Sequence, residues 1–235
     1  MSGHDGEAIQ RFFDGWDLYK RVIEHDYMFH GAIHQALGVA LRESRAKRIL
    51  DVGCGDASVM AGTLRGLPLV GYTGVDLSPV ALDAAADNLI AVGVKARLIE
   101  ADYLAFLRES RAAEFDAIVA GYSLHHLIGE DITHFFRACR LRLTSGGLLL
   151  IYDVFRGEDE SPETNVERNH RWRQETWTEL TPRDLEMIWS HVSSADHPKS
   201  RAEMTYHAVE AGFHQPPELL YEAPTEIHRL YAFSV

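Results

Sequence analysis

The stretch ILDVGCGD, residues 49–56, indicates the architecture of this chain more clearly than any other. Its apolar, β-prone residues run into two glycines, Gly53 and Gly55. Because glycine has no Cβ, a strand that ends in this pair can turn tightly and bring its backbone against a ligand. A helix that follows the turn presents free backbone N–H groups to the same ligand. The pattern alone also fits a plain tight turn.

The sequence on either side of this stretch alternates short apolar runs with helical patterns. This alternation is typical of strand, helix, strand units that build a parallel sheet with helices on both faces. Strands are predicted at residues 48–52, 69–75, 96–100, 115–120 and 147–154. Helices are predicted to start near Ser58, Pro79, Tyr103 and Asp131. We therefore expect an α/β fold that binds its ligand outside the carboxyl ends of the strands.

The whole chain, residues 1–235, is expected to form a single domain with additions to this core. The predicted parts are N-terminal helices in 1–47, a cofactor-binding core in 48–155, a helical insertion or lid in 156–204 and C-terminal strands in 205–235. The insertion is longer than a strand connection requires. Thr181 followed by Pro182 indicates a helix start within it.

Charge and cysteine content restrict the class of partner. Lys and Arg number 23 against 35 Asp and Glu, which gives a net charge of −12. This acidity argues against binding to nucleic acid or to an anionic membrane. Two cysteines, Cys54 and Cys139, are too few for a disulfide framework or a four-thiolate zinc site. The first ten residues do not resemble a secretory signal, and no apolar run has membrane-spanning length. We expect a soluble cytoplasmic monomer or homodimer that acts on a small molecule.

A second motif, GVDLS at residues 74–78, places Asp76 at the end of the next predicted strand. A carboxylate there can accept both hydroxyls of a ribose, which together with the glycine pair predicts an adenosine-containing cofactor. The alternative role of Asp76 is a helix cap. The dinucleotide pattern GxGxxG is incomplete, because Ser58 replaces its third glycine and Asp56 would repel a pyrophosphate. Cationic sulfonium and ammonium groups would be favoured near Asp51 and Asp56.

At this point the sequence resembles the class I S-adenosylmethionine-dependent methyltransferases, especially the small-molecule group that includes the ubiquinone and menaquinone methyltransferases. The resemblance covers residues 48–153, and one departure is Ala57 at the family's usual third glycine. Its segments, in order, are ILDVGCGD (49–56), GVDLS (74–78), EAD (100–102), FDAIVAGYSLHHL (115–127) and LRLTSGGLLLIYD (141–153). The resemblance implies a Rossmann-like, seven-stranded and mostly parallel sheet with an antiparallel last strand. It also implies S-adenosylmethionine as cofactor and S-adenosylhomocysteine as product.

The resemblance further implies which residues contact the cofactor. The methionine part would lie against the loop after the first strand, the ribose and adenine against the ends of the second and third strands, and the sulfonium over the end of the fourth. The residues at these positions are Asp51, Gly53, Cys54, Gly55, Asp76, Leu77, Ala101, Asp102, Ala120 and Gly121.

The expected reaction is direct displacement of the methyl group by an O, N or C atom of a small molecule. Its main requirements are alignment and exclusion of water, and a base is needed only if the nucleophile arrives protonated. Tyr122, His125 and His126 follow the fourth strand and are the catalytic candidates. Imidazole is suited to accept a proton near neutral pH, and His126 is the preferred base. The alternative is that one of the two adjacent histidines only packs or bonds to backbone.

Further candidates for contact with the substrate are Tyr27, His30, Asp153, Trp172 and Trp177. Core or lid packing is the alternative for the aromatic residues, and capping is the alternative for Asp153. No metal site is expected, because the histidines of the N-terminal helix lack a motif such as HExxH. The fourth strand also lacks the Asn or Asp followed by two prolines of adenine and amide N-methyltransferases. A nicotinamide-dependent NAD(P) oxidoreductase and a non-catalytic protein that binds S-adenosylmethionine remain as alternative functions.

Overall fold

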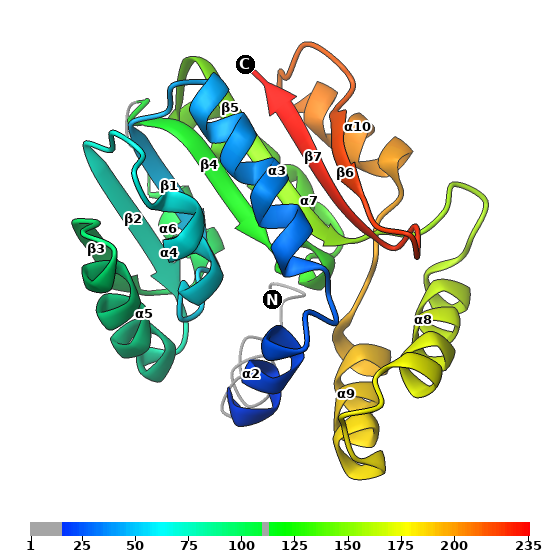
Figure 1. Ribbon diagram of the computed structural model, residues 1–235. Helices are drawn as coiled ribbons and strands as arrows, with labels where there is room; N and C mark the ends of the chain where they lie inside the picture. The colour runs from blue at the N-terminus through cyan, green and yellow to red at the C-terminus, as the bar shows by residue number, and fades with distance from the viewer. Residues whose placement is uncertain (1–15, 110–112) are drawn as a thin grey trace.

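The computed structural model describes residues 16–109 and 113–235, and it contains a seven-stranded sheet (Figure 1). The strand order is β3-β2-β1-β4-β5-β7-β6. Strands β1 to β5 are paired in parallel, and β7 runs antiparallel to both of its neighbours. The Rossmann-like fold with an antiparallel last strand is thus confirmed. The strands are β1 (Arg48–Val52), β2 (Gly71–Asp76), β3 (Ala96–Glu100), β4 (Phe115–Gly121), β5 (Leu143–Val154), β6 (Glu218–Glu222) and β7 (His228–Ser234).

Helices cover both faces of the sheet. Apolar side chains of α3, α4 and α5 pack on one face, and those of α6, α7 and α10 pack on the other. The helices are α2 (Trp16–Glu24), α3 (His30–Glu43), α4 (Ser58–Leu64), α5 (Pro79–Ala91), α6 (Tyr103–Arg108), the short 3₁₀ helix η1 (Leu124–His126), α7 (Glu130–Arg142), α8 (Pro162–Thr176), α9 (Pro182–Ala195) and α10 (Arg201–Glu210). The expectation about a secretory signal rests on residues that lie outside the described part.

Local capping explains why two helices begin where the sequence predicts. The Ser78 hydroxyl accepts a hydrogen bond from the backbone N–H of Ala81 at 3.2 Å, and Pro79 occupies the first turn of α5. Thr181 and Asp184 form a reciprocal capping box at the start of α9. Such caps depend only on neighbouring residues, so they can be recognised in the sequence.

Two predicted strand boundaries are wrong. Strand β2 begins at Gly71 rather than at Leu69, because Leu69 belongs to a turn in which its N–H donates to Leu67. Strand β5 begins at Leu143 rather than at Gly147. Its pairing with β4 shifts register between Leu143 and Leu148, and this irregularity accommodates the two glycines in that segment. In addition, α10 crosses the predicted boundary at 204/205, so the last part begins with a helix.

The helices of the insertion pack against the N-terminal helix at the carboxyl edge of the sheet, below the strands in Figure 1. Leu18 and Val22 of α2 join Trp177, Ile188 and Val192 in a small separate core. The guanidinium of Arg21 also donates two hydrogen bonds of 2.8 Å to the Asp184 carboxylate. Among the described residues, no helix combines the length and the apolar character that crossing a membrane requires.

Candidate active site

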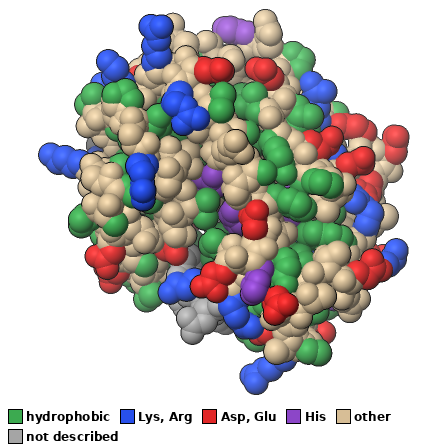
Figure 2. Space-filling view, in the orientation of Figure 1, with side chains coloured by type: hydrophobic (Ala, Val, Ile, Leu, Met, Phe, Trp, Pro, Cys, Tyr) green, Lys and Arg blue, Asp and Glu red, His purple; other side chains and the backbone are tan. Residues whose placement is uncertain are grey.

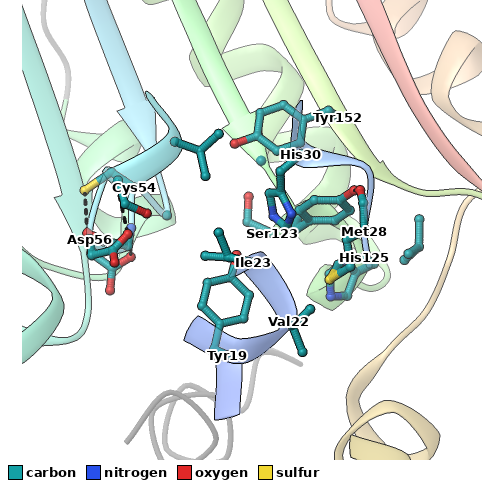
Figure 3. A pocket seen from close by; sticks show the side chains of 18 of the residues that line it. Tyr19, Val22, Ile23, Met28, His30, Cys54, Asp56, Ser123, His125 and Tyr152 are labelled. Atoms are coloured by element: carbon teal, nitrogen blue, oxygen red, sulfur yellow. Dashed lines mark hydrogen bonds between the residues drawn. The ribbon is translucent and has the colours of Figure 1, made fainter. Parts of the chain in front are cut away.

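A pocket opens at the carboxyl ends of the central strands, between the sheet, α2 and the insertion. Figure 2 shows histidine side chains in the hollow near the middle of this face. In the closer view of Figure 3, Cys54 and Asp56 lie on one wall and His30 and His125 on the opposite wall, with Tyr19 between them. The pocket lies where ligands bind in open α/β sheets.

The glycine pair forms a tight turn at the end of β1. Gly53 and Gly55 have φ angles of +68° and +53°, which L side chains rarely adopt. The N–H groups of Gly53 and Cys54 both donate to the Val75 carbonyl, at 2.8 and 3.1 Å. A Cβ on Gly53 would meet the Cβ of Ser123 at 3.1 Å, so the missing side chain keeps the space between β1 and β4 open.

Asp76 joins the tips of β1 and β2. One of its carboxylate oxygens accepts a hydrogen bond from the Gly55 N–H at 2.8 Å, and the other accepts from the Ser78 N–H at 2.9 Å. Each oxygen retains a further lone pair for a ligand. The side chain that caps α5 is that of Ser78, so Asp76 is not its N-cap. The carboxylate therefore supports the glycine turn and also lines the pocket.

The same end of the pocket is acidic, with Asp51, Asp56 and Asp76 along its wall. Burial raises the pKa of Asp51 to about 7, although a 2.7 Å hydrogen bond from the Tyr72 hydroxyl lowers it and the nearby Asp76 raises it. A cationic group beside Asp51 would favour its ionised form. The wall is consequently suited to a ligand that carries positive charge.

At the opposite wall, Asp153 fixes the orientation of His125. One Asp153 oxygen accepts hydrogen bonds from the backbone N–H groups of Leu124 and His125, at 2.8 and 3.1 Å. The other contacts Nδ1 of the His125 ring. The second ring nitrogen, Nε2, is 3.5 Å from an Asp196 oxygen. Burial lowers the pKa of His125, but the two carboxylates outweigh it and raise that pKa to about 9.

Two more histidines lie close to Asp196. Its Oδ1 atom is 3.7 Å from Nδ1 of His126 and 3.8 Å from Nε2 of His191. The ligand atoms of His125, His126 and Asp196 lie within 4.8 Å of one another, a spacing from which side chains can hold a metal ion. Both ring nitrogens of His125 face carboxylates, however, and this favours the imidazolium, which has no lone pair for a metal. We interpret the cluster as an ion pair, and the absence of a metal site stays a prediction.

Residues 50–149 match a protein-family model described as a methyltransferase domain. Together with the sheet order and the pocket at its carboxyl edge, this match settles the class of fold. The fold is that of the class I methyltransferases. The match does not distinguish the ubiquinone and menaquinone subgroup, which stays a prediction.

Solved structures with this fold support the assignment at low sequence identity. The plantazolicin methyltransferase BpumL, solved with SAH, is 14% identical with a TM-score of 0.67 over 97% of this chain and 93% of that one. An O-methyltransferase family protein from Burkholderia thailandensis is 16% identical, with a TM-score of 0.62 over 91% of this chain and 57% of that one. The S-adenosylmethionine-dependent methyltransferase SibL is 20% identical, with a TM-score of 0.58 over 86% and 54%.

Among curated proteins, the release factor glutamine methyltransferase of Deinococcus radiodurans is 32% identical over 84 residues. The matched segment is 36% of this chain and 28% of that protein, so the similarity is confined to a part of each. The similarity does not extend to the rest of that enzyme.

The pocket brings together most of the residues that the sequence singles out. Its lining includes Asp51, Gly53, Cys54, Gly55, Asp76, Leu77, Gly121, Tyr122, His125, His126, His30 and Trp177. The Tyr122 hydroxyl donates to the Met28 carbonyl and is 3.2 Å from Nδ1 of His228, so it takes part in an internal network. Burial lowers the pKa of His30 to about 4, which leaves this ring neutral at physiological pH.

Six of the predicted site residues do not line the pocket, namely Ala101, Asp102, Ala120, Tyr27, Asp153 and Trp172. The Asp102 carboxylate accepts a hydrogen bond from Ala105 N–H at the start of α6. Tyr27 stacks on Trp177 with ring centroids 4.9 Å apart. Asp153 is 1% exposed and acts on the site only through the turn that carries His125. For these residues, the structure shows packing, capping or support rather than direct access to a ligand.

Several lining residues come from segments that carry no motif. Tyr19 belongs to α2, Arg173 to α8, and Asp196 follows α9. Tyr152 of β5 lies beneath Gly121, where an added Cβ would come within about 2.1 Å of the Tyr152 ring. Arg173 shares the buried face of α8 with Asn165 and Asn169, so no apolar stripe in the sequence marks this face. Without the packing of α8 that face could not be identified.

Proposed function

We propose that the chain is an S-adenosylmethionine-dependent methyltransferase that transfers a methyl group to an O, N or C atom of a small molecule. The observation that carries this proposal is a single pocket that joins the glycine turn, Asp76 and His125. One wall is acidic and suited to an adenosyl group with positive charge, and the other carries an oriented imidazole. The methyltransferase-domain match over residues 50–149 supports the same reaction class.

The residues present fit this cofactor. Asp76 can accept hydrogen bonds from the ribose, while Gly53 and Gly55 leave backbone close to the methionine part. Asp51 and Asp56 favour the ammonium and sulfonium charges. When bound, S-adenosylmethionine supplies an electrophilic methyl group and a neutral thioether as leaving group. The chain itself has to orient the acceptor, exclude water and receive a proton.

We propose His125 rather than His126 as the base for an acceptor that arrives protonated. Asp153 occupies Nδ1 of His125, so the ring can exchange a proton with a ligand only through Nε2. The His126 ring instead directs Nδ1 at the Ala195 carbonyl, 3.3 Å away. A His125 ring whose pKa is near 9 is protonated at neutral pH, so its basic form increases as the pH rises. Helices α2, α8 and α9 cover this side and would restrict water during transfer.

The two alternative functions differ in what the pocket must do. A nicotinamide dinucleotide would place a pyrophosphate near Asp56, whose carboxylate accepts from Ser58 N–H at 2.9 Å and remains beside the turn. Such a site repels phosphate. A protein that binds S-adenosylmethionine without catalysis does not require a histidine whose ring is oriented by a carboxylate, as Asp153 orients His125. A cytoplasmic location and a monomeric or homodimeric state stay predictions.

The test combines binding with product detection. Calorimetry on the full chain should show stoichiometric binding of S-adenosylhomocysteine and none of NADH. Incubation with methyl-labelled S-adenosylmethionine and a panel of phenols, amines and carbon acids, followed by mass spectrometry, should show a methylated product. Binding of NADH in preference would support the oxidoreductase, and cofactor binding without any methylated product would support the non-catalytic alternative.

A further inference from the structure

Arg173 of α8 is a buried cation that is not paired within the described part of the chain. Its side chain is only 4% exposed, and its Nε and Nη1 atoms are buried without a hydrogen-bond partner. No carboxylate of residues 16–109 or 113–235 lies within ion-pairing distance of it. Buried guanidinium groups are normally hydrogen-bonded or paired, because a desolvated charge is costly.

The chain shows elsewhere how it accommodates a buried arginine. Arg142, at 2% exposure, donates from Nη1 to the Phe106 carbonyl at 2.9 Å and lies 3.8 Å from Glu114. Its guanidinium carbon is 4.3 Å from the centroid of the Phe106 ring. Arg173 has a similar aromatic contact, 5.4 Å from the Trp177 ring centroid, but no acceptor. The two arginines therefore differ in that no described residue supplies a hydrogen-bond acceptor or an anion to Arg173.

Arg173 is one of the residues that line the pocket. Trp177 lines it too, and its Nε1 atom is also buried without a partner. Burial lowers the pKa of Arg173 to about 10, and the nearby Asp196 raises it, so the group stays cationic at neutral pH. A ligand that enters the pocket is therefore positioned to supply an anion that none of the described residues provides.

We propose that Arg173 binds a carboxylate of the methyl acceptor, an inference that rests on the proposed methyltransferase function. The planar guanidinium matches a carboxylate through two parallel hydrogen bonds. A single negative charge fits better than a dianionic phosphate, because the acids Asp51, Asp56, Asp76 and Asp196 line the same pocket. Apolar residues of the same pocket, such as Ile188 and Val192, would contact the rest of the acceptor.

The methionine part of the cofactor is the other possible source of a carboxylate. The arrangement of the helices favours the acceptor. In Figure 1, α8 lies below the turn between β6 and β7, on the side of the molecule opposite to β2, β3 and α5, where Asp76 marks the predicted adenosine site. The test below separates the two sources.

The first measurement is the melting temperature of the ligand-free full chain. Arg173→Met removes an unpaired buried charge and keeps an aliphatic side chain, so the melting temperature should rise by roughly 2–4 °C. The matched variant Arg142→Met breaks an existing pairing and should lower it. An unchanged or lower melting temperature for Arg173→Met would mean that Arg173 is paired in the folded protein, and it would contradict the proposal.

The second measurement uses matched acids and amides as probes, with S-adenosylhomocysteine present. We would test 4-hydroxybenzoate against 4-hydroxybenzamide, and indole-3-acetate against indole-3-acetamide, by saturation-transfer NMR and titration. The acids should bind about tenfold or more tightly than the amides, and Arg173→Met should remove this preference. Arg173→Lys should retain part of it. Equal binding of acid and amide, or no binding of either acid, would overturn the proposal.

The third measurement identifies the source of the carboxylate. Affinities of S-adenosylhomocysteine and of 5′-methylthioadenosine, which lacks the amino-acid part, are compared in wild type and Arg173→Met. We expect both affinities to stay within about twofold. A selective loss of S-adenosylhomocysteine affinity would assign Arg173 to the cofactor instead. If wild type binds neither compound, the proposed function fails first, independently of Arg173.

Discussion

Asp153, near the end of β5, holds both the backbone and the ring of His125, which lies in the turn after β4. The carboxylate fixes the direction of the imidazole and occupies Nδ1, so a ligand would exchange a proton with the ring at Nε2, on the side where Asp196 lies 3.5 Å away. Carboxylate support of this kind also stabilises the imidazolium. The arrangement distinguishes His125 from its neighbour His126, and it makes the catalytic assignment testable.

Replacement of His125 should affect turnover far more than replacement of His126. His125→Gln removes the proposed base and should reduce turnover by roughly 10²- to 10⁴-fold, with affinity for S-adenosylhomocysteine nearly unchanged. His126→Gln should reduce it much less, because its ring faces a backbone carbonyl. Steady-state kinetics and calorimetry on the same preparations provide the two readouts. Full activity of His125→Gln would exclude it as the base.

The pH dependence of turnover should report the His125 ring. Activity requires its neutral form, so the rate should increase with pH and level off above about 9. Asp196→Asn removes one of the carboxylates that raise this pKa, so the rising limb should move to lower pH. Glu186→Gln, an exposed change on helix α9, which ends just before Asp196, is the control and should leave the profile unchanged. A profile that does not move in Asp196→Asn would mean that another group controls the rate.

Cofactor binding should depend on the ionisation of Asp51. Burial raises the pKa of this carboxyl to about 7, and a bound cation favours the charged form. The affinity for S-adenosylmethionine should therefore fall as the pH decreases below about 7, and binding near neutral pH should release protons. Tyr72→Phe removes the hydrogen bond that lowers the pKa, which should move this dependence to higher pH. Calorimetry in buffers of different ionisation enthalpy measures the released protons, and an affinity that is constant from pH 6 to 8 would contradict this role.

The sheet core and its cofactor-side loops were predictable because their signals are local. Gly53 and Gly55 indicate a turn because they have no side chains, and Asp76 indicates the end of a strand because it follows an apolar run. The insertion side was not predictable in the same way. Arg173 and Asp196 reach the pocket only after α8 and α9 pack against α2, and no short motif encodes that packing.

The choice between the two adjacent histidines illustrates the same limit. Both are buried, at 7% and 6% exposure, and both line the pocket, so composition and burial do not separate them. What separates them is the turn of η1, which directs His125 at the Asp153 carboxylate and His126 at the Ala195 carbonyl. The sequence places these partners far along the chain, and only the folded structure pairs them.

The close contact between Gly121 and Tyr152 should make this glycine intolerant of substitution. A Cβ at position 121 would come within about 2.1 Å of the Tyr152 ring, whose hydroxyl is 3.2 Å from Nε2 of His34. Gly121→Ala should lower the free energy of unfolding by about 1–3 kcal/mol. In a Tyr152→Ala background, where the obstructing ring is absent, the same change should cost much less. Urea denaturation of the four proteins measures the difference, and equal costs would show that Tyr152 is not the obstacle.

Asp76 needs a sharper test than a single substitution, because it both supports the glycine turn and faces the proposed ribose. Titration calorimetry should compare S-adenosylhomocysteine with its 2′-deoxy analogue in wild type and in Asp76→Ala. We expect one site per chain in wild type, a loss of about 1–3 kcal/mol of binding free energy in Asp76→Ala, and a penalty for the deoxy analogue that is present only when Asp76 is present. Absence of S-adenosylhomocysteine binding to wild type, or an affinity that Asp76→Ala leaves unchanged, would contradict the assignment of this pocket to an adenosyl cofactor.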